Sequence, residues 1–265
     1  GLLFVVLKPG AWPVAMPFVL LWVLSPLLAW RISVPPKIAK SQVLSSEETG
    51  SLRLIARRSW RFFEAFVDQE DHALPPDNFQ EDPEPAGAHR TSPTNLGLYL
   101  LSTTVAHDFG WIGVLDTAER LEATLQTMTI LHRVRGHFVN WYDTRNLRPL
   151  DPMYVSTVDS GNLAGHLIAL AQACRELMHR PLFGPEISEG ILDALQLLLG
   201  SVAKAGHPWR AQMATAAQLR EAIEAMSAGL QDAPTSLPEW VGRFRELKTR
   251  AESLMDLARK LATEV

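Results

Sequence analysis

The pattern of apolar and polar positions divides the chain into an apolar front and a longer amphipathic part. Between residues 11 and 30, 16 of 20 residues are apolar and none is charged. As an α-helix, this stretch covers the roughly 30 Å hydrocarbon layer of a bilayer. We therefore predict a membrane segment at residues 1–34. The alternative is a buried amphipathic hairpin made of two shorter apolar pieces.

The residues around the apolar stretch bear on its type and orientation. A signal peptide fits less well, because a basic leader and a small-residue cleavage site are missing. Three prolines within the stretch weaken the helix prediction, although membrane bundles tolerate proline. Basic residues are more frequent after the stretch (Arg31, Lys37 and Lys40) than before it (Lys8). We therefore expect the C-terminal part to face the cytoplasm.

Downstream of the apolar stretch, apolar residues recur at spacings of three and four, which is typical of helices. Seven helices are predicted, and a capping box of Ser45 with Glu48 opens the first. Their expected ranges are 45–66, 93–109, 116–131, 159–177, 186–203, 211–230 and 238–264. In the last helix, apolar residues alternate at spacings of four and three, so this helix needs a partner.

Three of these helices carry specific expectations about burial. The first is expected to bury Leu52, Ile55, Phe62, Phe63 and Phe66, which share one side of a helix. The third is expected to bury Leu121, Leu125, Met128 and Leu131. The fourth is expected to bury Leu163, Leu167, Leu170, Cys174 and Leu177.

Two connections, residues 71–94 and 134–160, are longer than a helical protein needs to turn its chain. Long ordered loops are uncommon unless they are functional. Thr91 or Ser92 is expected to cap the second helix, with Pro93 in its first turn. Capping leaves other polar residues of the first loop unexplained, and for these we predict recognition of a polyhydroxylated ligand. They are Asp77, Asn78, Arg90 and Asn95.

The second loop combines aromatic, carboxylate and amide side chains, which suit a sugar. An aromatic face covers the C–H face of a pyranose, while polar groups bridge its hydroxyls. The candidates here are Trp141, Tyr142, Asp143, Asp159, Ser160 and Asn162. The alternative is a buried Trp141 with Asp159 as a helix N-cap.

Composition and charge exclude several classes of protein. With 47% hydrophobic and 20% charged residues, the chain is not disordered. A net charge of −4 argues against nucleic acid as a partner, and the single Cys174 permits no internal disulfide. His132, His137 and His166 flank the second loop, but no metal-binding string occurs, so no metal or other cofactor is expected. Because the chain starts at Gly1 within an apolar run, we expect it to be a fragment.

Four strings resemble the middle region of bacterial cyclic β-1,2-glucan synthases and follow each other in that family's order. They are residues 74–80 (LPPDNFQ), 90–102 (RTSPTNLGLYLLS), 136–144 (GHFVNWYDT) and 154–167 (YVSTVDSGNLAGHL). The resemblance covers roughly residues 20–180, and after Pro181 only generic helices are recognised. In this family a glucoamylase-like (α/α)6 barrel follows the membrane helices and closes the glucan by transglycosylation. A glycosyltransferase domain extends the glucan from UDP-glucose, and all domains face the cytoplasm.

The resemblance implies an all-α fold, an incomplete (α/α)6 barrel-like domain preceded by a transmembrane helix. The barrel is incomplete because it needs twelve helices and seven are predicted. The implied domains are a membrane segment at 1–34, a juxtamembrane linker at 35–44, and the N-terminal portion of the glucoamylase-like domain at 45–265. The implied partners are a β-1,2-glucan chain, the lipid bilayer of the bacterial inner membrane, and the remaining domains of the synthase.

The implied function is glucan binding within a larger carbohydrate-active enzyme. We nominate no catalytic pair, because the family's catalytic glutamates lie downstream of the matched region, and retaining transfer needs two carboxyl groups about 5–5.5 Å apart. Two alternatives remain open. The chain is a non-catalytic, membrane-tethered module that binds or scaffolds glucan, or a structural fragment whose polar loops only cap helices.

Overall fold

The computed structural model describes residues 10, 12–34, 44–204, 210–230, 232 and 234–263. The expected juxtamembrane linker therefore lies outside the described residues, apart from Leu44. The chain divides into two compact units, Gly1–Thr49 and Gly50–Val265, and each is described by itself.

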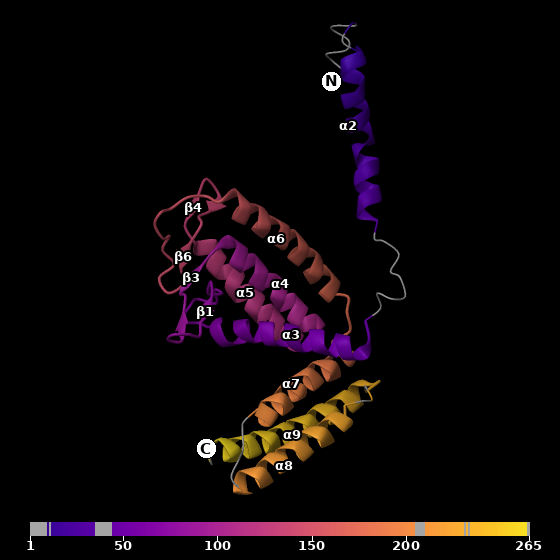
Figure 1. Cartoon of the computed structure of the whole chain (residues 1–265), viewed down its shortest axis with the longest axis vertical. Helices are drawn as coiled ribbons and strands as arrows, with labels where there is room; N and C mark the ends of the chain where they lie inside the picture. The colour runs from indigo at the N-terminus through magenta and orange to yellow at the C-terminus, as the bar shows by residue number, and fades with distance from the viewer. Residues whose placement is uncertain are drawn as a thin grey trace. The chain divides into compact units, whose positions relative to one another are not determined.

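The first unit contains one long apolar helix, α2 (Trp12–Ser33), drawn in Figure 1. The helix continues through Pro17 and Pro26, and none of its side chains is buried. It is long and apolar enough to cross a bilayer, a test that a signal sequence near the N-terminus also passes. The predicted helix is thus confirmed. The alternative of a hairpin is wrong, because no turn interrupts the helix.

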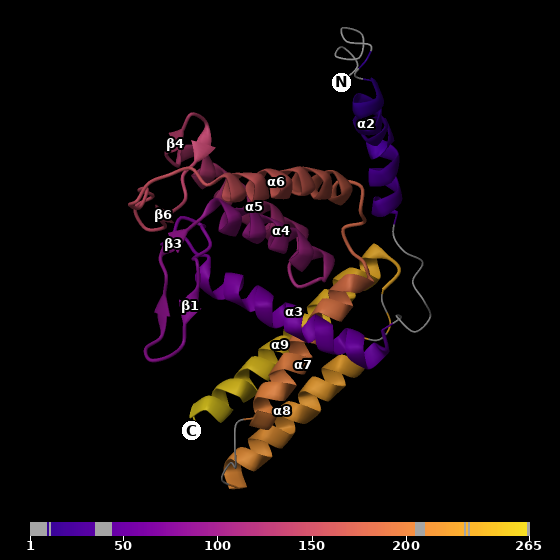
Figure 2. The same cartoon turned by 45° about the horizontal axis from the view of Figure 1, so that its top comes forward.

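Seven further helices follow among the described residues. They are α3 (Ser46–Phe66), α4 (Pro93–Asp108), α5 (Val114–Ile130), α6 (Thr157–Leu177), α7 (Pro185–Lys204), α8 (Arg210–Ala228) and α9 (Leu237–Thr263). The prediction of a mostly helical chain is confirmed, and the predicted ranges differ from the observed ones by about two residues. Within the second unit, Figures 1 and 2 show no closed barrel among the described helices.

Helix α3 begins as predicted but packs differently from the prediction. The Ser45 N–H donates to Glu48 Oε2 at 2.8 Å and the Glu48 N–H donates to Ser45 Oγ at 3.2 Å, so the capping box is confirmed. Leu52 and Ile55 were expected to be buried, yet they are 51% and 58% exposed. The buried residue is Trp60, which stacks on Tyr99 of α4. Phe62, Phe63 and Phe66 are half-buried, and Phe63 packs beside Trp60 and Tyr99. The predicted face is therefore wrong at Leu52 and Ile55, while its C-terminal half does pack.

Helices α4 and α6 lie side by side and run in the same direction (Figures 1 and 2). Thr94, near the start of α4, bonds Asp159, near the start of α6. At the other end, Thr104 of α4 and Ala173 of α6 line one small cavity together with Thr117, which lies near the start of α5. Helix α5 therefore runs opposite to the other two, and the starts of α4 and α6 share one end of the group.

The main core lies among these three helices and includes residues from both long loops. It consists of Leu74, Leu96, Leu100, Leu121, Met128, Leu131, Val139, Tyr142, Leu163 and Leu170. Leu125 was expected in this core, but it is 38% exposed. Because Leu74, Val139 and Tyr142 belong to loops, the loops are anchored by apolar packing rather than lying free on the surface.

Three short antiparallel ladders organise the loops, and the sequence analysis did not predict them. They are β1 (Phe79–Gln80) with β2 (Ala86–Gly87), β3 (Arg90–Thr91) with β6 (Tyr142–Asp143), and β4 (Arg133–Val134) with β5 (His137–Phe138). The β3–β6 ladder pairs Arg90 with Asp143 and Thr91 with Tyr142. It therefore joins the first long loop directly to the second.

Helices α7, α8 and α9 contain a separate apolar core. Leu195, Leu219, Ile223, Leu247 and Leu254 are among its buried residues. The apolar seam predicted for the last helix contributes to this core, and α8 packs against α9. Arg53 of α3 and Trp111 both donate to the Asp193 carboxylate of α7, which joins this bundle to the preceding helices.

The close approach of α4 and α6 requires a glycine. A Cβ atom at Gly97 would lie 2.2 Å from His166 Nδ1 and 2.9 Å from His166 Cβ, so the His166 side chain fills that space. Gly165, on α6, has no neighbouring atom within 4 Å of an added Cβ. An added methyl group therefore clashes at Gly97 but not at Gly165, so the second glycine serves as a control for the first.

We predict that Gly97→Ala lowers the free energy of unfolding by about 1–3 kcal/mol, because the added methyl overpacks the interface. Gly165→Ala, the control, should raise stability by up to about 1 kcal/mol, since alanine favours the helix. Denaturant unfolding measures both values. Adding His166→Ala to Gly97→Ala should recover part of the loss. Equal effects of the two glycine substitutions would contradict the packing that we describe.

Candidate functional site

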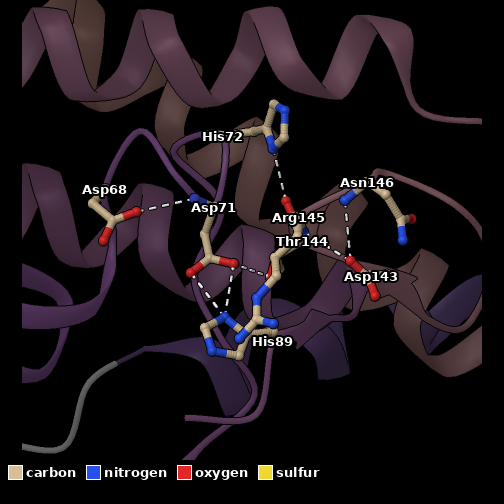
Figure 3. A network of polar contacts seen from close by, with 8 residues as sticks. All are labelled: Asp68, Asp71, His72, His89, Asp143, Thr144, Arg145 and Asn146. Atoms are coloured by element: carbon tan, nitrogen blue, oxygen red, sulfur yellow. Dashed lines mark hydrogen bonds and ion pairs between the residues drawn. The ribbon is translucent and has the colours of Figure 1, made fainter.

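The two long loops are joined by a buried carboxylate, Asp71, which is only 6% exposed (Figure 3). Thr144 Oγ1 donates to Asp71 Oδ1, and His89 Nδ1 lies 3.0 Å from both carboxylate oxygens. The Thr144 N–H also donates to the His89 carbonyl at 3.1 Å. Asp71 therefore holds together residues from three places in the sequence.

The chain around Asp71 is held in an unusual backbone conformation. His72 and Ala73 have φ values of 54° and 57°, in the left-handed region that non-glycine residues seldom occupy. Two threonines of α5 donate hydrogen bonds to the backbone carbonyls of these two residues. Thr127 Oγ1 donates to His72 O and Thr124 Oγ1 donates to Ala73 O, both at 2.8 Å. Helix α5 thus fixes the path of the first loop as it leaves Asp71.

Asp77 is the centre of a second polar cluster, which contains all four predicted residues of the first loop. Arg90 donates from Nε and Nη2 to Asp77 Oδ2, at 3.1 and 2.8 Å. Asn78 Nδ2 donates to the same oxygen at 3.1 Å, and Asn95 Nδ2 donates to Oδ1 at 3.3 Å. Both carboxylate oxygens therefore already accept hydrogen bonds from neighbouring side chains.

The Arg90 guanidinium also joins this cluster to Trp141 in the second loop. Its Cζ atom lies 4.7 Å from the centre of the Trp141 ring, in cation–π geometry. Trp141 is half-buried, and its carbonyl accepts from the Leu150 N–H at 3.0 Å. The side chain is consequently held at a fixed place while part of its surface stays open.

The side chains of Asp159 and Asn162 both bond Thr94, which lies in the first turn of α4. Thr94 Oγ1 donates to Asp159 Oδ1 at 2.6 Å, and Asn162 Nδ2 donates to Thr94 Oγ1 at 3.2 Å. The alternative that Asp159 is the N-cap of α6 is wrong: Ser156 caps the helix, because its Oγ accepts from the Asp159 N–H at 3.1 Å. Asp159 lies inside the first turn, where its carboxylate is directed to a neighbouring helix.

The two clusters adjoin because Thr94 and Asn95 are consecutive residues at the start of α4. Ser92 caps this helix, as predicted, by accepting from the Asn95 N–H at 3.2 Å. Seven of the predicted residues thus belong to one continuous group: Asp77, Asn78, Arg90, Asn95, Trp141, Asp159 and Asn162. Sequence reasoning missed Thr94, although it lies between two predicted features, the Ser92 cap and Asn95.

Three other predicted residues have mainly structural surroundings. Asp143 Oδ1 accepts from the backbone N–H groups of Arg145 and Asn146, at 2.8 and 3.1 Å, and so fixes a turn (Figure 3). The Ser160 hydroxyl is buried and has no hydrogen-bond partner among the described residues. Tyr142 is fully buried, so it presents no surface to a ligand.

The Tyr142 hydroxyl stabilises the second loop. It donates to the His132 carbonyl at 2.6 Å and accepts from the Val139 N–H at 2.8 Å. Burial raises the pKa of the Tyr142 phenol, and the hydrogen bond from Val139 and the charge of Arg133 only partly oppose this shift. The phenol therefore remains protonated and keeps both bonds across the neutral pH range.

We predict that Tyr142→Phe lowers the free energy of unfolding by about 1–3 kcal/mol, because it leaves a buried N–H and a carbonyl without their partner. Tyr154 offers a matched control, since it is 55% exposed. Tyr154→Phe should change stability by less than about 0.5 kcal/mol. Denaturant unfolding of both variants gives the comparison, and an unchanged midpoint for Tyr142→Phe would contradict a structural role.

Comparison with known proteins confirms the resemblance. No family model matches the chain. The chain is 45% identical, over 249 residues, to the cyclic beta-(1,2)-glucan synthase NdvB of Rhizobium meliloti (strain 1021). The alignment covers 94% of this chain but only 8% of that protein. It is therefore longer than the range of roughly 20–180 that the sequence analysis recognised, and it extends into the part that contains α7–α9.

Proposed function

We propose that this chain binds a β-1,2-glucan as part of a membrane-bound cyclic β-1,2-glucan synthase and presents it for ring-closing transglycosylation. The proposal builds on the relationship to NdvB, of whose length the chain spans less than a tenth. The observation that carries it is the group formed by Trp141, Asp159 and their neighbours at the common end of α4 and α6. An aromatic surface beside hydrogen-bonding groups suits a polyhydroxylated ligand with apolar C–H faces.

The glucan-binding residues that we propose do not contribute equally. Trp141 supplies the surface for a sugar ring, and Asp159 and Asn162 bond its hydroxyls. The cluster of Asp77, Asn78, Arg90 and Asn95 positions Trp141, because its internal hydrogen bonds occupy Asp77 and fix the guanidinium against the indole. Asp143 and Tyr142 support the second loop rather than contacting the sugar. The predicted sugar contact of Ser160 stays a prediction.

The wider architecture that we propose is the N-terminal portion of a glucoamylase-like (α/α)6 barrel at residues 45–265. The alternating directions of α4, α5 and α6 support it, because successive helices of such a barrel also alternate in direction. Residues 1–34 form the membrane segment and 35–44 the juxtamembrane linker. The chain lies in the bacterial inner membrane with residues 45–265 in the cytoplasm, in contact with the remaining domains of the synthase.

We assign no catalytic carboxylate within the described residues. Both oxygens of Asp77 accept hydrogen bonds from side chains, which favours a positioning role over proton transfer. This observation favours a second candidate function, in which the chain is a non-catalytic, membrane-tethered glucan-binding module. Incubation of the chain with linear β-1,2-glucan separates the two: cyclic products support catalysis by this chain, and binding without turnover supports the module.

The experiment that tests the proposed function is calorimetric titration of the chain, in detergent, with linear β-1,2-glucan. Trp141→Ala and Asp159→Asn should each weaken binding about tenfold or more, because the first removes the aromatic surface and the second a charged acceptor. Asp256→Asn is the control, since Asp256 is exposed on α9 and outside the site.

Thermal unfolding of the same variants excludes global effects. All three should remain folded and unfold cooperatively. No measurable binding by the unaltered chain, or equal affinity of the unaltered chain and both site variants, would overturn the proposed function.

A further inference from the structure

We infer that Thr94 is a positioning residue, which combines Asp159 and Asn162 into one receptor for two adjacent hydroxyls of a single glucosyl unit. This inference rests on the proposed function and specifies the part of the sugar that the site recognises. It also assigns a role to a residue that lies in α4, whereas the two groups it positions both lie in α6.

The Thr94 hydroxyl uses its hydrogen-bonding capacity between these two side chains. Its one proton goes to Asp159 Oδ1 at 2.6 Å, a short bond of the kind that carboxylates make with hydroxyls. One of its lone pairs accepts from Asn162 Nδ2 at 3.2 Å. The Thr94 hydroxyl thus lies between the Asp159 carboxylate and the Asn162 amide at the start of α6. Its two hydrogen bonds set the orientation of both groups.

The atoms that remain are the ones that a ligand can use. Within the described part of the chain, Asp159 Oδ2 and Asn162 Oδ1 have no hydrogen-bond partner, and Asn162 is exposed. Asp77 differs, because neighbouring side chains bond both of its oxygens. A carboxylate oxygen and an amide oxygen held side by side accept protons from two neighbouring hydroxyls, and the second amide proton of Asn162 remains to be donated.

The linkage of a glucan decides whether adjacent hydroxyls are available. An internal unit of a β-1,2-glucan keeps its hydroxyls at carbons 3, 4 and 6, and the first two are neighbours. An internal unit of a β-1,3-glucan keeps hydroxyls at carbons 2, 4 and 6, of which no two are on adjacent ring carbons. A receptor for a neighbouring pair therefore accepts internal units of the first polymer and rejects those of the second.

The test titrates the chain, in detergent, with linear β-1,2-glucan and with linear β-1,3-glucan of matched length. Thr94→Val removes the hydroxyl at nearly constant shape and should weaken β-1,2-glucan binding about tenfold, whereas Thr94→Ser keeps the hydroxyl and should restore it. Thr104→Val is the matched control on the same helix, because the Leu101 carbonyl is the one hydrogen-bond partner that Thr104 Oγ1 has among the described residues. The control should bind as the unaltered chain does.

The outcomes separate this inference from the proposed function. If the unaltered chain binds β-1,2-glucan but Thr94→Val and Thr104→Val bind it equally well, the role of Thr94 is overturned while glucan binding stands. Equal affinity of the unaltered chain for both polymers overturns recognition of a neighbouring pair on internal units, and this measurement needs no variant to fold. If the unaltered chain binds neither polymer, the proposed function itself fails.

Discussion

The site depends on one buried interaction, the hydrogen bonding of the Asp71 carboxylate to Thr144 and His89. A buried carboxylate without partners costs several kcal/mol, so the native loops must bring donors to it. Thr144 is 73 residues away from Asp71 in the sequence, and its hydroxyl donates to Asp71 directly. Because Thr144 directly follows β6 and His89 directly precedes β3, the same interaction supports the pairing of these strands. The positions of Arg90 and Trp141 follow from that pairing.

Around this anchor, the polar residues of the loops fall into two groups with different physical roles. In one group, around Asp77, hydrogen bonds are made within the protein and their effect is to fix Trp141. In the other group, Thr94 holds Asp159 and Asn162, and one oxygen of each has no hydrogen-bond partner in the described part of the chain. Preorganisation of this kind lowers the entropy lost on binding, since few side chains are left to be ordered by a ligand.

Local signals made much of the fold predictable from the sequence, and non-local contacts account for what was missed. The Ser45–Glu48 capping box and the Ser92 cap each involve residues three positions apart, so their spacing alone identifies them. The spacing of Leu52 and Ile55 was equally regular, but both are exposed, because α3 packs against Tyr99 through Trp60 and Phe63 instead. The short ladders and the bridge from Thr94 to Asp159 join distant residues, which no local pattern reports.

The same limit applies to the candidate residues. Residue types indicated a sugar-like chemistry in both loops, but they did not separate Asp159, which bonds Thr94 of a neighbouring helix, from Asp143, which fixes a turn in its own loop. Nor did they show that Tyr142 is buried. These distinctions depend on which side chains meet after folding, and Asp71 was not nominated because its partners lie in other parts of the chain.

Glucan binding at the joined loops is tested by hydrogen exchange of the full chain, measured by mass spectrometry with and without linear β-1,2-glucan. We expect glucan to slow amide exchange in residues 90–97, 137–143 and 156–163, because these backbones carry the site. Exchange in α8 and α9 should not change. Unchanged exchange in all three regions at saturating glucan, or slowing confined to α8 and α9, would show that these loops do not bind the glucan.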